Sequence, residues 1–192
     1  MASVELTTLR VRIMELRHRL LPARWPLLAT PTQSERARAF TLLAHAEVET
    51  YLENVVLGYV DRRVTEWLVG GSPSMCVVGL VKTAQRVVKS ADTDQLSIQD
   101  VVLLGKRQLS SYITTRNHGV RERQLSRLFI PIGLELAMLP SGFSQTMDAW
   151  GRRRGGYAHQ GGFVAIPTPK SEYDDARQII DYLVKIDRKL SQ

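Results

Sequence analysis

The sequence contains one cysteine, Cys76, in 192 residues. A disulfide framework and a zinc site built on several cysteines are therefore excluded. The histidines are also few and far apart, at positions 18, 45, 118 and 159, and none has the HxxxH or HExxH spacing of a metal site. A Walker-type phosphate loop and a GxSxG nucleophile elbow are both missing. We therefore predict neither a metal nor a cofactor.

Long hydrophobic runs are missing as well. The longest nearly apolar run covers residues 128–139 and is interrupted by Pro131 and Glu135. A membrane-spanning helix needs about 20 such residues. Residues 1–6 lack the basic start and apolar stretch of a signal peptide. We expect a cytoplasmic protein with no membrane partner.

The composition is that of a folded, basic protein. Hydrophobic residues make up 44% of the chain and charged residues 23%, which supplies a core and excludes disorder for most of it. Lysine and arginine together number 26 against 19 acidic residues, a net charge of +7, and 20 of the 26 are arginine. The planar arginine fork suits phosphate, so nucleic acid is the first candidate partner. Replacement of lysine by arginine in a high-GC genome explains the bias equally well.

Hydrophobic spacing predicts helices along the whole chain. The first covers residues 4–21 and ends at Pro22, and the second runs from about 33 into the high 60s, with Thr32 or Ser34 as its cap. Further helices are expected at about 74–90, from Ser97 to about 116, at 121–130, from Ser141 to about 159, and at 172–190. Residues 161–170 form a loop or short hairpin, with 163–166 the one strand-like stretch. This pattern predicts an all-α bundle.

An unusual stretch, WGRRRGGYAHQGG, covers residues 150–162. Each glycine inside a helix costs about 1 kcal/mol, so residues 155 and 156 indicate the close approach of another backbone or of a phosphate. An arginine and a histidine together are sufficient for metal-free phosphodiester cleavage. Imidazole exchanges the proton of a ribose 2′-OH near neutral pH, and guanidinium stabilises charge on the phosphoryl oxygens. The spacing alone discriminates poorly, because Arg12/His18 and Arg38/His45 also satisfy it.

Three regions in order give this stretch a context. Residues 39–53 contain the pattern A-x-x-E-x-E-x-Y-L. Residues 117–120 read NHGV and are followed by Leu125 and by PIG at 131–133. Residues 147–150 lead into RGGYAH at 154–159. Together they resemble the HEPN superfamily over residues 33–160. The resemblance is closest to small prokaryotic HEPN proteins of toxin–antitoxin and phage-defence systems, which carry a terminal R-x4-6-H motif.

The resemblance implies one HEPN-like domain over residues 1–192, with an N-terminal helix and linker (1–30), a core (33–160), and a loop and C-terminal helix (161–192). Its fold is a helical bundle with an up-and-down four-helix core. The implied activity is metal-independent RNA endonucleolysis, a hydrolase-type toxin or antiviral effector function, at a site shared across a homodimer. An antitoxin or a defence-system protein is the expected restraining partner.

The motif assigns His159 as general acid/base and Arg154 as the catalytic arginine. Helix geometry favours Arg152 instead, because seven residues return it to the face of His159, whereas five residues leave Arg154 about 140° away. Arg153 is predicted to contact the RNA backbone. The motif also departs from the family pattern at two glycines: Gly155 replaces the asparagine of many members, and Gly161 occupies the place of a tyrosine that some members carry.

Two accessory residues have open interpretations. Tyr157 either stacks on a base or packs inside the protein, and Glu47 either orients a site residue or is a paired carboxylate at the core boundary. His45 is expected on the solvent side of its helix, and His118 in a loop. The alternative function is a catalytically silent HEPN module that binds protein or nucleic acid. A helix–turn–helix regulator is disfavoured because the third and fourth helices are too apolar for a recognition helix.

Overall fold

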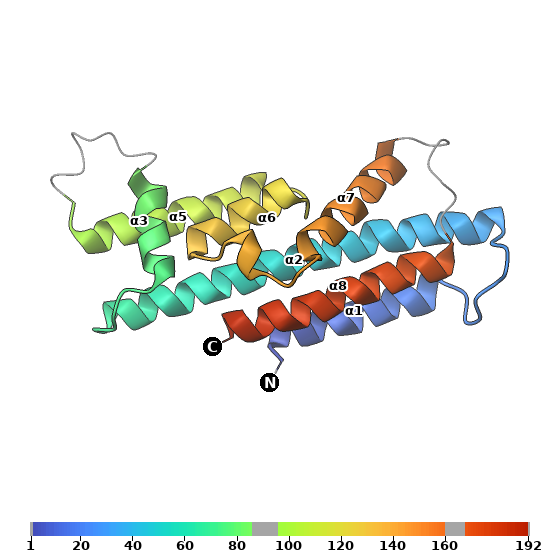
Figure 1. Ribbon diagram of the computed structural model, residues 1–192, viewed down its shortest axis with the longest axis horizontal. Helices are drawn as coiled ribbons and strands as arrows, with labels where there is room; N and C mark the ends of the chain where they lie inside the picture. Colours follow the sequence, from blue (N-terminus) through green and yellow to red (C-terminus); the bar gives the residue numbers. More distant parts are fainter. Residues whose placement is uncertain (1, 86–95, 160–167, 192) are drawn as a thin grey trace. The chain divides into compact units, whose positions relative to one another are not determined.

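The computed structural model describes residues 2–85, 96–159 and 168–191, without the side chain of His159 (Figure 1). These residues form seven α-helices and two 3-10 turns and contain no strand, which confirms the all-α prediction. Within these ranges, no helix combines the length and the apolar character needed to cross a membrane. The predicted strand-like stretch at 163–166 and the end of the predicted 74–90 helix lie outside the described residues. The chain divides into two compact units that share one long helix, and each unit is described by itself.

Unit 1 comprises residues 1–52, 119–122 and 140–192. It contains α1 (Val4–Leu20), the first part of α2 (Pro31–Leu68), α7 (Phe143–His159) and α8 (Pro169–Leu190). Each helix contributes an apolar stripe to one core, which includes Leu6, Leu9 and Ile13 of α1, Phe40, Ala44, Val48 and Leu52 of α2, Phe143, Met147 and Trp150 of α7, and Ile179, Leu183 and Ile186 of α8. Helices α1 and α8 lie side by side (Figure 1).

A buried carboxylate joins the start of α1 to the end of α8. Asp187 is fully buried and accepts hydrogen bonds from the Ser3 N–H (2.9 Å), the Ser3 hydroxyl (2.5 Å) and the Tyr51 hydroxyl of α2 (3.2 Å). Three donors compensate this carboxylate for its loss of water. The contact fixes α1 and α8 in opposite directions.

The N-terminus of α2 corrects one prediction. The helix begins at Pro31, and Thr30 caps it: the Thr30 hydroxyl accepts from the Gln33 N–H (3.2 Å), and the Gln33 side chain accepts from the Thr30 N–H (2.9 Å). This is a reciprocal capping box with proline at the first helical position. The prediction of Thr32 or Ser34 as the cap was wrong. Ser34 lies in the first turn of the helix, where it is 5% exposed and its hydroxyl has no partner among the described residues.

Unit 2 comprises residues 53–118 and 123–139. It contains the rest of α2, α3 (Met75–Gln85), α5 (Ile98–Arg116), most of α6 (Glu122–Phe129), and the 3-10 turns η1 (Ile130–Ile132) and η2 (Leu136–Met138). The predicted cap of α5 is confirmed, since Ser97 and Asp100 form a capping box. An ion pair of 2.7 Å between Lys106 of α5 and Asp61 of α2 crosses the unit.

Two glycines allow α3 to pack closely within unit 2. A Cβ atom on Gly105 of α5 would lie 2.1 Å from the Leu80 carbonyl oxygen of α3, and one on Gly79 of α3 would lie 2.2 Å from the Pro131 carbonyl oxygen of η1. No side chain fits at these separations. The two glycines therefore set how closely α3 approaches its neighbours.

Candidate functional site

Helix α7 presents the Arg–His motif at the end of a buried stripe. Phe143, Met147 and Trp150 are spaced by four and three residues, so they share one face, and each is at most 1% exposed. Arg154 follows Trp150 by four residues and continues this face, but its side chain is exposed. The helix thus carries a guanidinium at the point where its buried stripe reaches solvent.

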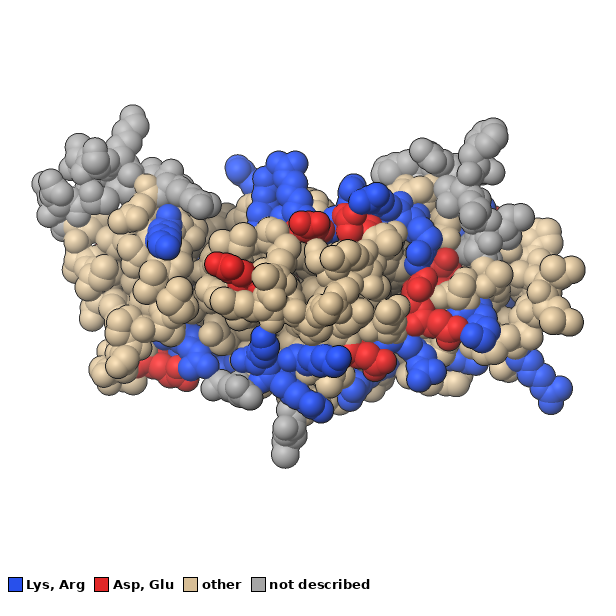
Figure 2. Space-filling view, in the orientation of Figure 1, with Lys and Arg blue, Asp and Glu red and all other residues tan. Residues whose placement is uncertain are grey.

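The three consecutive arginines have different surroundings. Arg152 forms an ion pair with Asp148, one turn earlier on α7, and Asp148 also pairs with Arg121 (3.2 Å). Arg121 and Arg152 hold the pKa of the Asp148 carboxyl below its ordinary value, with the Arg152 hydrogen bond the largest cause. Figure 2 shows basic and acidic side chains adjacent to one another over the region of α7, as such pairing requires. Arg152 is therefore a surface ion-pair residue in this structure.

Arg153 points to α8. It forms an ion pair with Asp175, and its Nε lies 3.8 Å from Glu172. Burial raises the pKa of the Asp175 carboxyl, and the Arg153 charge opposes that shift. Arg153, predicted to contact an RNA backbone, is paired within the chain. Arg154 differs from both neighbours, because no carboxylate of the described residues lies within ion-pairing distance of it.

A buried carboxylate holds the last turns of α7 in place. Glu172 of α8 is 3% exposed and accepts hydrogen bonds from the Thr41 hydroxyl of α2 (2.7 Å) and the Tyr157 hydroxyl of α7 (2.9 Å). Burial, followed by the Glu172 charge, raises the pKa of Tyr157 above its ordinary value. The Tyr157 ring also lies 5.9 Å from the Arg38 guanidinium of α2. Tyr157 is thus half-buried, and its contacts join α7 to α8 and α2 within unit 1.

His45 of α2 is buried, so its predicted position facing solvent was wrong. The residue is 2% exposed, and its ring centroid lies 5.1 Å from that of Trp150. Burial, with a smaller contribution from the charge of Arg154, lowers the pKa of His45 to about 4. The imidazole is therefore neutral at pH 7. A sequence signal existed, because Thr41, His45, Val48 and Leu52 are spaced by four, three and four residues and form a second buried stripe on α2.

Sequence reasoning missed the carboxylate beside this histidine. One Glu49 oxygen accepts from the Gly119 N–H (2.5 Å), and the other lies 3.7 Å from Nδ1 of His45. Glu47, the candidate named from the sequence, instead forms an ion pair with Arg12 of α1 at 3.2 Å. Its carboxylate therefore links α1 to α2, as the boundary interpretation of Glu47 predicts.

His159 is the last residue of α7, and its side chain lies outside the described residues. His118 is exposed in the segment after α5, as its predicted loop position requires. Within the described ranges, no group of three or more His, Cys, Asp or Glu side chains is arranged to hold a metal ion.

Comparisons with known proteins found no matching family model, curated protein or solved structure. The HEPN resemblance therefore stays a prediction, based on residues 39–53, 117–133 and 147–159 of this chain.

Proposed function

We propose that the protein is a metal-independent RNA endonuclease of the HEPN type, acting as a toxin or defence effector. The observation that carries the proposal is the state of Arg154. Of the three successive arginines, it is the one without a carboxylate within ion-pairing distance among the described residues, and it lies five residues before His159. An unpaired, exposed guanidinium is available to a phosphate, whereas Arg152 and Arg153 would first have to leave their carboxylates.

The arrangement of unit 1 supports the HEPN-like fold. Helices α1, α2, α7 and α8 share one core, and α1 and α8 run in opposite directions. An up-and-down four-helix core is the finer form of the fold that we propose, although α1 (Val4–Leu20) and α8 (Pro169–Leu190) lie outside the core of residues 33–160 that the sequence leads us to expect. A Cβ atom on Gly155 would have no described atom within 4 Å, which leaves space for a second α7 at a dimeric composite site.

The proposed reaction uses a ribose 2′-OH as the nucleophile. His159 accepts its proton as the 2′-oxygen attacks the adjacent phosphorus, and it then returns a proton to the departing 5′-oxygen. Arg154 stabilises the charge that develops on the equatorial oxygens. The products carry a 2′,3′-cyclic phosphate and a 5′-OH. The reaction requires no metal, so cleavage should persist in EDTA.

Single substitutions test this assignment with a 5′-labelled single-stranded RNA, using protein freed of any partner. His159→Ala should lower the cleavage rate by about 10²–10⁴-fold and Arg154→Ala by about 10²–10³-fold. Arg152→Ala is the matched control, since it removes the same charge two residues away and breaks only an exposed ion pair. It should remain within about threefold of wild type.

Product ends distinguish this chemistry from that of a contaminating nuclease. A 2′,3′-cyclic phosphate in EDTA supports the mechanism, whereas dependence on magnesium or manganese contradicts it. Equal loss in Arg152→Ala and Arg154→Ala would remove the special role of Arg154. If wild type binds RNA without cleaving it, the silent binding module is the better description.

A further inference from the structure

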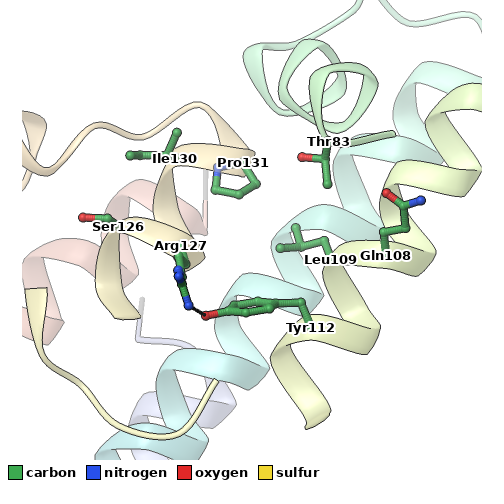
Figure 3. Close-up of a pocket in the computed structure, with 8 residues that line it drawn as sticks. All are labelled: Thr83, Gln108, Leu109, Tyr112, Ser126, Arg127, Ile130 and Pro131. Carbon is green, nitrogen blue, oxygen red and sulfur yellow. Dashed lines mark hydrogen bonds between the residues drawn. The ribbon is translucent and has the colours of Figure 1, made fainter. Parts of the chain in front are cut away.

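Unit 2 contains a pocket of about 410 Å³ that the proposed nuclease site does not use (Figure 3). This volume is within the range of pockets that bind small molecules. Four elements line it, with Thr83 from α3, Gln108, Leu109 and Tyr112 from α5, Ser126 and Arg127 from α6, and Ile130 and Pro131 from η1. All eight residues belong to unit 2, so the pocket is formed within one compact unit.

The walls of the pocket are mainly apolar. Leu109, Ile130, Pro131 and the ring of Tyr112 supply carbon surface. The Thr83 hydroxyl donates to the Gly79 carbonyl of its own helix (2.9 Å), and the Gln108 side-chain oxygen is buried with no hydrogen-bond partner among the described residues. Carbon atoms thus form most of the wall, which favours a ligand with an apolar body.

The exception is Arg127, at one edge of the pocket. Its Nη1 donates to the Tyr112 hydroxyl (3.3 Å), and its Cζ lies 5.7 Å from the centre of the Tyr112 ring. Figure 3 shows the Arg127 guanidinium beside the Tyr112 hydroxyl, to which this hydrogen bond joins it. Arg127 is exposed, and no carboxylate of the described residues lies within ion-pairing distance of it. The tyrosine orients the guanidinium, and its remaining N–H groups are available.

We propose that this pocket binds a small carboxylic acid with an apolar body. The carbon body of the ligand occupies the space between Leu109, Ile130 and Tyr112, and its carboxylate pairs with Arg127. A planar guanidinium fork binds both carboxylate oxygens at once, so charge as well as shape selects the ligand. This site is separate from the Arg154/His159 chemistry and does not depend on it.

The test uses 2-naphthoate and decanoate as probes, with neutral 2-naphthamide as the uncharged analogue of the first. Calorimetric titration of the full chain should show at least one acid binding with Kd below about 1 mM, and 2-naphthamide binding should be weaker than 2-naphthoate binding by about tenfold. Arg127→Gln should weaken acid binding by about tenfold or more, because it removes a charge-assisted bond, and should leave amide binding within about twofold. Ile130→Trp, at a position that is 54% exposed, should block the opening and weaken both ligands.

Arg123→Gln is the matched control, since it removes the same charge one helical turn earlier on α6, at a residue that does not line the pocket. Acid binding should stay within about twofold of wild type. Three results would each overturn the proposal: no binding of either acid at millimolar concentration, equal affinity for naphthoate and naphthamide, or equal losses in Arg123→Gln and Arg127→Gln. Chemical-shift changes confined to residues outside α5, α6 and η1 would also overturn it.

Discussion

Replacing Gly155 by alanine tests whether this glycine is needed for the fold of one chain or for the assembly of two. A Cβ atom at this position meets no described atom within 4 Å, so unit 1 gains no steric clash. Alanine in a helix interior is more stable than glycine by about 0.5–1 kcal/mol. Gly155 is four residues from the end of α7, where fraying reduces the gain, so we expect the free energy of unfolding to rise by about 0.5 kcal/mol.

Two further glycines calibrate this measurement. Gly58, inside α2, also has no atom within 4 Å of a Cβ, and Gly58→Ala should add about 1 kcal/mol without changing assembly or cleavage. Gly105→Ala places a Cβ 2.1 Å from a backbone oxygen of Leu80 and should lower stability by about 3 kcal/mol. Urea unfolding at a concentration low enough for the chain to be monomeric measures all three variants, so that a weaker dimer does not itself lower the apparent stability.

Assembly then gives the decisive result for Gly155→Ala. If two α7 helices meet at this glycine, the added methyl group should weaken the dimer by about tenfold in light scattering on dilution, and RNA cleavage should fall with it. Stability would rise while assembly falls, a combination that a purely structural glycine does not produce. A loss of stability comparable to that of Gly105→Ala would refute the reasoning. Behaviour identical to Gly58→Ala in all three assays would remove Gly155 from the dimer contact.

Two other predictions follow from unit 1. Thr30→Ala should lower the free energy of unfolding by about 1 kcal/mol because it removes the cap of α2. Ser34→Ala should raise it by a few tenths of a kcal/mol, because the Ser34 hydroxyl is buried without a partner among the described residues. Urea unfolding measures both variants, and a larger loss in Ser34→Ala than in Thr30→Ala would instead indicate a Ser34 cap. The folded-state pKa of His45, about 4, is below the ordinary 6.5, so the unfolded state takes up the proton first as pH falls and stability declines between pH 6.5 and 4. We expect a loss of about 2 kcal/mol between pH 7 and pH 5 that His45→Leu abolishes, and parallel pH curves for the two proteins would contradict the assignment.

Helix periodicity and capping rules predicted most of the secondary structure. The apolar spacing in α1 and α8, and the Ser97 cap of α5, are local signals, and the structure confirms them. The start of α2 was less evident, because Thr30, Thr32 and Ser34 are all good caps and only proline at position 31 distinguishes the first. The close approach of α3 to α5 through Gly105 was not predictable, because it depends on which helix packs against that glycine in three dimensions.

The candidate site was predicted only in part, for a related reason. The sequence indicates that residues 150–159 are unusual, but it does not show which carboxylates reach them. Asp148 is one turn from Arg152 and could have been paired with it from helix spacing alone. Asp175 and Glu172 reach Arg153 only because α8 packs beside α7, and His45 is buried only because α7 covers that side of α2 with Trp150. Contacts between helices that are distant in sequence thus decide the state of each motif residue.

The same contacts discriminate among motifs that the sequence leaves equivalent. Three histidines follow an arginine at compatible spacing: His18 follows Arg12, His45 follows Arg38, and His159 follows Arg152, Arg153 and Arg154. Arg12 pairs with Glu15 (2.7 Å) and Glu47 (3.2 Å), and Arg38 pairs with Glu35 (3.0 Å). The histidine of the second pair, His45, is buried and neutral, so it has no access to a substrate proton. Arg154 is the arginine of this set that has no carboxylate within ion-pairing distance among the described residues, which is why the cleavage assay should respond to Arg154→Ala far more than to Arg12→Ala or Arg38→Ala.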